Sequence, residues 1–562
     1  MTKKELLDLT VQRPAIFAVM AFAIAALQGP YGNLTLLFLY RQDRWLLLAA
    51  ALLLGLCVWR VSPRARAFTT DWRLAVGVGV IMAIAAYCGH YLILSGYDMS
   101  RDEQMATFDA AVFARGELVA PLDGLWRHHA EALNTMFMYP ASQTAGWISS
   151  YLPLNAALRA LFDLAGDAAL TGPAMLVLGA IALWGCARRI WPGEREAAVV
   201  AMLLYLGSGQ ILFNGMTAYA MPAHLTLNLC WLWLFLRRTV WADFSALLVG
   251  FIAVGLHQPI MHPMFVAPIL FLLLLERDWR RAGLYFAGYS AIGIFWMCWP
   301  GWMWPLVEAD AGAQQAMGVD FLSRIALAME GSRGGLTNMV ANLLRFVAWQ
   351  HLLLLPLLIV GLKIARRDRM AGALAGGIVL TLTVVAIILP YQGHGFGYRY
   401  LHGLIGNCIL LAVYGWISLG DAIGRWRTLL VRSTLASLAV LLPMQAWMAH
   451  GFYAAPAAVS ERLSAIDADY VVVGAADAPF TADLVINPPF LDTRPIRLLR
   501  ETMSPALVQA LCASRSRVAL AGTCEFAPIL AYYRPDPSAV ASADKAMADN
   551  LRRAGCQIVQ IR

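Results

Sequence analysis

The stretch LAVGVGVIMAIAAYCGHYLILSG (residues 74–96), followed directly by YDMSRDEQMATFD (97–109), decides the class of fold. The first part contains no Asp, Glu, Lys or Arg and is long enough to cross a bilayer, which takes about 20 residues in a helix. The second part carries four carboxylates, at Asp98, Asp102, Glu103 and Asp109. This abrupt change predicts a transmembrane helix that leaves the membrane near residue 97.

Apolar segments of this kind recur along the chain. We identify thirteen candidates: 14–40, 45–59, 74–96, 168–187, 197–213, 221–236, 244–260, 262–275, 282–300, 344–362, 371–391, 402–419 and 430–449. Hydrophobic residues make up 60% of the 562 residues and charged residues only 14%, against about 25% charged in soluble proteins. The composition excludes a disordered chain and an ordinary soluble enzyme. It predicts an all-α polytopic membrane domain over residues 1–449, with about 13 transmembrane helices.

The first segment has two interpretations, a signal peptide or an uncleaved helix. Glu5 and Asp8 are atypical of the basic start of a signal peptide, and the apolar run resumes at Leu34. We therefore expect an uncleaved helix.

Basic residues predict the orientation in the membrane. The net charge of +8 arises before residue 450, because the last 113 residues hold 11 basic and 11 acidic residues. When the loops are taken alternately, one set carries 22 Lys and Arg and the other carries 10. The positive-inside rule then places the N-terminus in the cytoplasm. With thirteen spans, loop 97–167, segment 301–343 and the tail lie on the outer face.

The sequence pattern of the tail, residues 450–562, predicts a small α/β domain. No nucleotide-binding glycine pattern opens its helices. The expected strands are 470–473, 518–521 and 557–561, and the expected helices are 460–466, 504–513 and 543–554.

The cysteines do not predict a metal site. No Cys-x-x-Cys or Cys/His spacing typical of zinc ligands occurs. Cys512 and Cys524 in the tail are either a disulfide on an oxidising face or a pair of reduced core residues, and the sequence leaves both open.

The adjacent carboxylates Asp102 and Glu103 give the strongest functional signal. On a helix, neighbouring side chains diverge by about 100°, so one carboxylate can face a cleft while the other contacts a neighbouring element. The alternative is a solvated loop face. An amphipathic helix is expected just after the pair, over 105–115.

Here the sequence resembles the GT-C integral-membrane glycosyltransferases, which carry an Asp-Glu pair in a long first outer loop. The basic cluster Arg127-His128-His129 follows at about the family's spacing, GLHQP (255–259) is similar to the family's Thr-Lys-Gly-Pro turn, and GYRYL (397–401) is similar to its Arg-Tyr entry to a late helix. The resemblance covers about 74–420. It is closest to the branch of protein O-mannosyltransferases and lipid A aminoarabinose transferases (glycosyltransferase family 39-like).

Three features depart from the family pattern. Two spans, 14–59, precede the helix that is usually first, His257 stands where the turn has lysine, and the 127–129 cluster lacks the family's proline.

The resemblance implies transfer of a sugar from a polyprenyl-phosphate donor to an acceptor by inverting displacement. It also implies a bacterial inner membrane, with the active site and the C-terminal domain on the periplasmic face. Asp102 is expected to be the general base, with Glu103 positioning it or binding a metal. The expected ligands of the donor phosphate are Arg127 and Arg399, with His128, His129, His257 and His402 as secondary candidates. No cofactor is certain, and a divalent cation is an option. The acceptor is open among protein, lipid A, polysaccharide and lipid-linked glycan, and nucleic acid is a poor fit to the charge pattern.

Structural roles compete with these functional ones. Arg399 at a helix end is also typical of a side chain that reaches the interface, and His224, His257 and His262 are also typical of structural histidines. The tryptophan-rich run 295–304 favours an interfacial aromatic belt over a sugar platform. Glu308, Asp310 and Asp320 fit a solvated loop better than an acceptor site.

Three other function classes stay open beside transfer from a lipid-linked donor. They are a transporter or flippase, an O-antigen ligase or polymerase, and a non-catalytic partner in envelope assembly. A transporter is the main alternative, although we detect no internal repeat.

Overall fold

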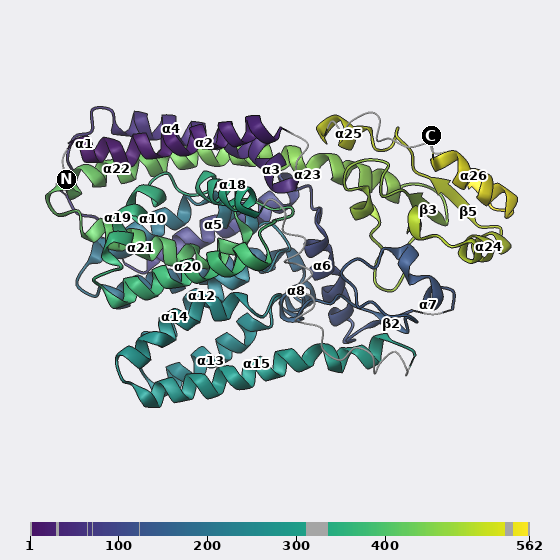
Figure 1. The fold of residues 1–562 in the computed structure, drawn as a ribbon, viewed down its shortest axis with the longest axis horizontal. Coiled ribbons are helices and arrows are strands. Elements are labelled where there is room, and N and C mark those ends of the chain that lie inside the picture. Colours follow the sequence, from purple (N-terminus) through teal and green to yellow (C-terminus); the bar gives the residue numbers. More distant parts are fainter. Residues whose placement is uncertain are drawn as a thin grey trace. The chain divides into compact units, whose positions relative to one another are not determined.

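The computed structural model describes residues 3–29, 33–64, 66–69, 71–122, 124–310, 335–533 and 543–559 (Figure 1). The chain divides into two compact units. The first unit comprises Met1–Gly89, Ala169–Met297 and Asp320–Met448, and the second comprises His90–Ala168, Cys298–Val319 and Ala449–Arg562. The predicted division into 1–449 and 450–562 stays a prediction of the sequence.

The first unit is built from helices. Its elements, with most of α5 and α15, are α1 (Lys3–Leu7), η1 (Asp8–Gln12), α2 (Arg13–Gln28), α3 (Leu34–Phe38), η2 (Leu39–Asp43), α4 (Arg44–Val58), α5 (Arg73–Leu92), α9 (Thr171–Ile190), α10 (Arg195–Leu206), α11 (Gly209–Asn214), α12 (Met221–Phe235), α13 (Val240–Val254), α14 (Met261–Leu275), α15 (Trp279–Val307), α18 (Gly335–Ala348), α19 (Leu354–Ile364), α20 (Arg369–Ile388), η5 (Arg399–Leu404), α21 (Ile405–Ile417), η6 (Gly420–Ala422), α22 (Ile423–Ala436) and η7 (Ser437–Leu441).

Seven helical stretches among the described residues are long and apolar enough to cross a membrane. They are Lys4–Gln28, Arg73–Leu92, Ala168–Ile190, Trp279–Val307, Arg369–Ile388, Arg399–Ile417 and Gly420–Ser464. Glu196–Leu206, Val240–Val254, Met261–Leu275 and Leu354–Ile364 are apolar but shorter. The predicted helical membrane protein is confirmed, whereas the number of thirteen spans is not.

Interruptions of the helices explain part of this difference. The expected span 197–213 is split into α10 and α11 because Ser208 caps α11 by accepting a hydrogen bond from the Ile211 amide. The expected span 344–362 is split into α18 and α19. Hydropathy alone does not detect such breaks, because a short polar step barely lowers the average over 20 residues.

Glycines allow the closest helix contact in this unit. A Cβ atom on Gly361 of α19 would overlap the Leu411 carbonyl of α21, and one on Gly415 of α21 would overlap the Leu357 carbonyl of α19. The two backbones therefore touch directly, as is common where small residues line helix pairs in membranes.

The second unit combines helices with two small sheets. Its elements are α6 (Arg101–Ala114), β1 (Ala120–Pro121), α7 (Trp126–His129), η3 (Ala130–Leu133), β2 (Gly146–Trp147), α8 (Leu154–Leu164), η4 (Ala168–Leu170), α23 (Leu442–Ser464, which begins in the first unit), β3 (Tyr470–Val473), η8 (Thr481–Leu484), β4 (Ile496–Leu499), η9 (Arg500–Thr502), α24 (Pro505–Ala513), β5 (Arg517–Leu520), α25 (Ala527–Tyr533), α26 (Ala543–Arg553) and β6 (Gln557–Val559). Strands β1 and β2 pair antiparallel. A four-stranded parallel sheet has the order β4-β3-β5-β6.

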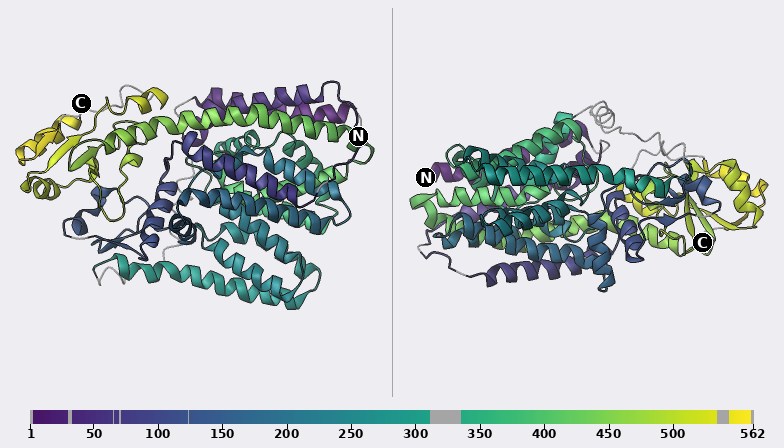
Figure 2. Two further views of the ribbon diagram at one scale, coloured as in Figure 1. Left: turned by 180° about the vertical axis from the view of Figure 1, so that it is seen from behind. Right: turned by 90° about the horizontal axis from the view of Figure 1, so that it is seen from below.

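The predicted α/β character of the tail is confirmed. The strands lie in the yellow-green to yellow part of the ribbon (Figure 2). Of the expected final strand, 557–559 is described and forms β6, while 560–561 lie outside the described residues. The sequence did not predict β4, because Arg497 interrupts its apolar pattern. In the fold Arg497 is buried, and its guanidinium donates to the Leu484 and Ser460 carbonyls.

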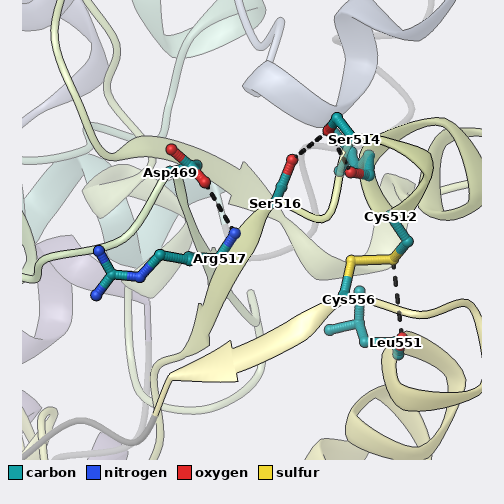
Figure 3. Close-up of a disulfide and its surroundings, with 8 residues drawn as sticks. Asp469, Cys512, Ser514, Ser516, Arg517, Leu551 and Cys556 are labelled. Carbon is teal, nitrogen blue, oxygen red and sulfur yellow. Dashed lines mark hydrogen bonds between the residues drawn. A yellow bond between two sulfur atoms is a disulfide. The ribbon is translucent and has the colours of Figure 1, made fainter.

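Both interpretations of Cys512 and Cys524 are wrong. Cys512, at the end of α24, forms a disulfide with Cys556, which immediately precedes β6 (Figure 3). Cys524 is exposed and is not in a disulfide. Sequence spacing does not determine disulfide partners; the return of the chain to the sheet edge does.

Candidate functional site

The acidic pair of the second unit lies at the first turn of α6. Ser100 is the N-cap: its hydroxyl accepts from the Glu103 amide at 3.3 Å, and the Glu103 carboxylate accepts from the Ser100 amide at 3.1 Å. This reciprocal capping box satisfies two backbone donors that have no partner inside the helix. It fixes where α6 begins, and it keeps the Glu103 carboxylate hydrogen-bonded to the backbone of Ser100.

Glu103 is buried, with 1% of its surface exposed. The Tyr453 hydroxyl donates to its two carboxyl oxygens, each at 3.2 Å. Burial, and then the neighbouring Asp98 carboxylate, raise the pKa of Glu103 to about 8, although the hydrogen bonds from Ser100 and Tyr453 oppose this. Glu103 is therefore largely protonated at neutral pH and is a poor proton acceptor.

Asp102 has a different environment. It is half-buried, and its Oδ1 accepts a hydrogen bond from the Tyr151 hydroxyl at 2.6 Å. A carboxylate that is partly exposed and oriented by a hydroxyl has the geometry of a group that receives a proton from an incoming ligand. The expected divergence of the two adjacent carboxylates is thus present on α6.

From the sequence, no role is assigned to three charged residues around this site. Asp109 accepts hydrogen bonds from the Ser149 amide and hydroxyl, and burial raises its pKa to about 7. Arg101 is buried and donates to the Ala482 carbonyl at 2.7 Å, with its Nε 3.3 Å from Asp483. Burial raises the pKa of Asp483 to about 6. These contacts join α6 to η8, about 380 positions away in the sequence.

The basic cluster of the second unit forms α7. Arg127 and His128 are exposed and His129 is half-buried. The Arg127 Nε donates to the Leu122 carbonyl at 3.0 Å, and His129 Nδ1 lies 3.4 Å from the Ser504 hydroxyl. Glu308, by contrast, is buried and accepts from the Ser142 and Gln143 amides, which ties the end of α15 to the loop before β2. Asp320 lies outside the described residues.

The remaining predicted residues, His257, Arg399 and His402, belong to the first unit. Arg399 opens η5 after the loop Gly393-His-Gly-Phe-Gly397. Gly395 and Gly397 have φ angles of +129° and +64°, which favour glycine. Gln392 closes the loop by donating to the Gly397 carbonyl at 2.9 Å and accepting from the Arg399 amide at 2.8 Å.

The Arg399 side chain is buried, with 5% exposed, and does not reach outward. Its guanidinium carbon lies 4.6 Å from the centre of the Tyr219 ring, which is a cation–π contact. A Cβ atom on Gly395 would overlap the Arg399 stem, so this glycine makes the space in which Arg399 lies. An arginine held inside the unit in this way fits an anion ligand better than an interfacial anchor.

The four histidines of this unit that the sequence analysis considered differ in their contacts. His262 is a structural histidine, because its ring nitrogens lie 2.7 Å from Asn228 Oδ1 and 2.8 Å from the Tyr289 hydroxyl. His402 is fully buried, and neither ring nitrogen has a hydrogen-bond partner among the described residues. His224 is buried beside Gly403, while His257 is half-buried in the turn between α13 and α14.

No group of three or more His, Cys, Asp or Glu in the described ranges has an arrangement that could hold a metal ion. Metal binding by Glu103 stays a prediction of the sequence.

The structure was also compared with known proteins. The chain is similar to ArnT. Against ArnT from Cupriavidus metallidurans bound to undecaprenyl phosphate, the TM-score is 0.47 with 12% identity over 75% of this chain and 86% of that one. Against ArnT from the same organism in the apo state, it is 0.42 with 14% identity over 73% and 84%. ArnT is a lipid A aminoarabinose transferase. No family model and no curated protein matches the sequence.

Proposed function

We propose that this protein is a membrane glycosyltransferase that moves a sugar from a polyprenyl-phosphate-linked donor to an acceptor on the outer face of the membrane. The contrast between Asp102 and Glu103 carries the proposal. Glu103 is sealed and satisfied by Ser100 and Tyr453, whereas Asp102 is partly exposed and held by Tyr151. One carboxylate is thus structural, and we assign the other, Asp102, as the group that takes a proton.

In the proposed reaction, the acceptor hydroxyl or amine attacks the anomeric carbon as Asp102 receives its proton. The bond from that carbon to the phosphate oxygen breaks, and the polyprenyl phosphate leaves with the electron pair. A single displacement inverts the anomeric centre. Negative charge grows on the leaving phosphate, so fixed cations stabilise the transition state. Arg399 is proposed for this role, with Arg127, His128, His129, His257 and His402 as further candidates.

An apolar cavity in the first unit supports a lipid-linked donor. Its volume is about 380 Å³, and its lining includes Leu344 of α18 and Leu401 of η5. Leu401, which lines the cavity, is two residues from Arg399. One short segment therefore contributes both to the wall of the cavity and a buried cation. This combination fits a molecule with a hydrocarbon chain and a phosphate.

The decisive experiment is a transfer assay in reconstituted vesicles, with a panel of polyprenyl-phosphate sugars and acceptors. We expect the wild type to release free polyprenyl phosphate from one donor, and Asp102→Asn to reduce this release at least 100-fold, in the range of a lost general base. Asp163→Asn is the matched control, because Asp163 is an exposed carboxylate on α8 of the same unit. Wild-type turnover by Asp102→Asn would contradict the assignment of the base.

A transporter or flippase is the second candidate, and the broken helices favour it. Ser208, between α10 and α11, donates to Gln350, between α18 and α19, at 2.8 Å, and Gln350 donates to Gln210 at 2.9 Å. Transporters often place substrate sites where helices are discontinuous. Flux of a labelled lipid-linked sugar without release of polyprenyl phosphate would select this candidate over transfer.

A further inference from the structure

The segment between the two N-terminal helices contacts the Arg399 loop. It consists of α3 and η2, residues 34–43, and follows α2. Thr35, Leu39 and Asp43 are each 0% exposed. The sequence assigned no role to this part of the chain, which belongs to the two spans that precede the usual first helix of the resembled family. A carboxylate buried among apolar helices is costly unless it is paired.

Asp43 is paired with α18. Its Oδ2 accepts from the Arg345 Nε at 2.9 Å and its Oδ1 accepts from the Trp349 indole nitrogen at 2.6 Å. Arg345 is also fully buried, and its guanidinium carbon lies 4.8 Å from the centre of the Phe38 ring. Asp43 therefore neutralises Arg345 and sets its orientation.

Arg345 in turn holds the loop that precedes η5. Its Nη2 donates to the Gly395 carbonyl at 2.8 Å, and Gly395 is the residue against which the Arg399 stem lies. Arg345 and Arg399 are near enough for their positive charges to repel each other. The Asp43 carboxylate offsets one of these charges, which leaves one net positive charge among the three residues.

Further hydrogen bonds join the 34–43 segment and α18 to the Arg399 loop. The Thr35 hydroxyl donates to the Gln392 carbonyl at 2.9 Å, and Gln392 binds both the Gly397 carbonyl and the Arg399 amide. On α18, the Asn342 amide donates to the Pro390 carbonyl at 3.1 Å. The start of the glycine-rich loop is thus bonded to α3 and α18, its middle is bonded to Arg345, and Gln392 joins its start to its end.

We infer that Asp43 is a positioning residue: through Arg345 and Gly395 it fixes the loop that places the Arg399 guanidinium against the donor phosphate. The inference rests on the proposed function for its link to the donor, but not for its link to the loop. It gives the N-terminal helical pair a role in the site. The Arg345 Nη1, which is buried and has no hydrogen-bond partner among the described residues, is a further donor at this place.

The test compares Asp43→Asn with Asp243→Asn in the full-length protein. Asp243 is the matched control, because it is also buried and paired with an arginine of the first unit, Arg281, at 2.7 Å and 2.9 Å, and it accepts from the Tyr285 hydroxyl. Both substitutions remove a buried carboxylate and are expected to lower thermal stability by similar amounts.

Two readouts then separate positioning from stability. Backbone hydrogen exchange over 392–399 is expected to rise at least tenfold in Asp43→Asn and to stay unchanged in Asp243→Asn. The KM for the lipid-linked donor is expected to rise about tenfold in Asp43→Asn only, with kcat changed less than twofold. Unchanged loop exchange in Asp43→Asn would overturn the inference, whatever the activity.

Further outcomes distinguish the inference from the proposed function. A faster-exchanging loop with an unchanged donor KM would overturn the link between Asp43 and the donor. A faster-exchanging loop in a protein whose wild type transfers no sugar would support the positioning and overturn the proposed function. If Asp43→Asn does not fold, the pair Asp43→Leu with Arg345→Met replaces it, because apolar residues of similar size often substitute for a buried ion pair without loss of stability. Wild-type loop exchange and donor KM in that double variant would also overturn the inference.

Discussion

The first turn of α6 and the Arg399 loop are both polar sites in an apolar protein, but they are built differently. At α6, Ser100 and Glu103 are three residues apart, and their bonds are local. At the Arg399 loop, the bonds to α3 and α18 join residues 48 to 357 positions apart, such as Asn342 with Pro390 and Thr35 with Gln392. The α6 site is therefore readable from a short motif, whereas the loop exists only once helices from three parts of the chain have packed.

The two sites also differ in charge. At α6 the carboxylates are in excess, and burial keeps Glu103 largely protonated. At the loop two arginines, Arg345 and Arg399, lie near each other, and the carboxylate of Asp43 is paired with Arg345. In the function proposed above, the first site takes up a proton and the second binds an anion.

The largest expected effect concerns binding of the donor phosphate at the Arg399 loop. Arg399→Ala should raise the donor KM roughly 100-fold, because a lost hydrogen bond to a charged group costs about 1.5–3 kcal/mol. The acceptor KM should change less than threefold. Steady-state kinetics with each substrate varied in turn measures both constants.

The control for Arg399 is Arg238→Ala, which breaks an exposed ion pair with Glu276 in the same unit. Exposed ion pairs contribute little, so both KM values should stay near wild type. An unchanged donor KM in Arg399→Ala would leave Arg399 with a structural role, in its contact with Tyr219.

A smaller effect is expected from the contact that orients Asp102, the proposed base. Tyr151→Phe removes the hydroxyl that holds Asp102, and we expect kcat to fall about tenfold, which corresponds to about 1.4 kcal/mol, while the donor KM is unchanged. Tyr91→Phe is a matched control, because the Tyr91 hydroxyl donates to Asp167 at the same 2.6 Å in the same unit. Equal losses of kcat in the two variants would contradict a special role for the Tyr151 contact.

The smallest effect concerns Glu103 and appears in stability. Because the folded-state pKa of Glu103, about 8, lies above its ordinary value of 4.5, the folded protein holds a proton that the unfolded chain releases. Its contribution is fully present below pH 4.5 and is lost as the pH rises towards 8. Glu103→Gln should therefore flatten the fall of the thermal midpoint between pH 5 and 8.

Thermal unfolding in detergent at several pH values measures this slope. Glu131→Gln, at an exposed position, should keep the wild-type slope. The same slope in Glu103→Gln and wild type would mean that Glu103 does not govern the pH dependence in this range.

The sequence by itself determined the features that depend on local composition. Apolar runs predicted the helical membrane protein, and period and turn residues predicted strands 470–473 and 518–521 of the tail, because these signals lie within 4 to 20 consecutive residues. The thirteen spans predicted from hydropathy are not confirmed among the described residues, since Ser208 and the 349–353 break divide segments that are apolar on average.

Only the tertiary structure decided which of two adjacent carboxylates is sealed, which cysteine pairs with Cys512, and which residues support Arg399. Tyr453 closes over Glu103 from 350 positions away, Cys556 reaches Cys512 through the return of the chain to β6, and Asp43 reaches Arg345 across 302 positions. Each of these contacts depends on packing between distant segments. The physical reason is the cost of burying a polar group, which is met by whichever partner the fold brings near, and no local pattern names that partner.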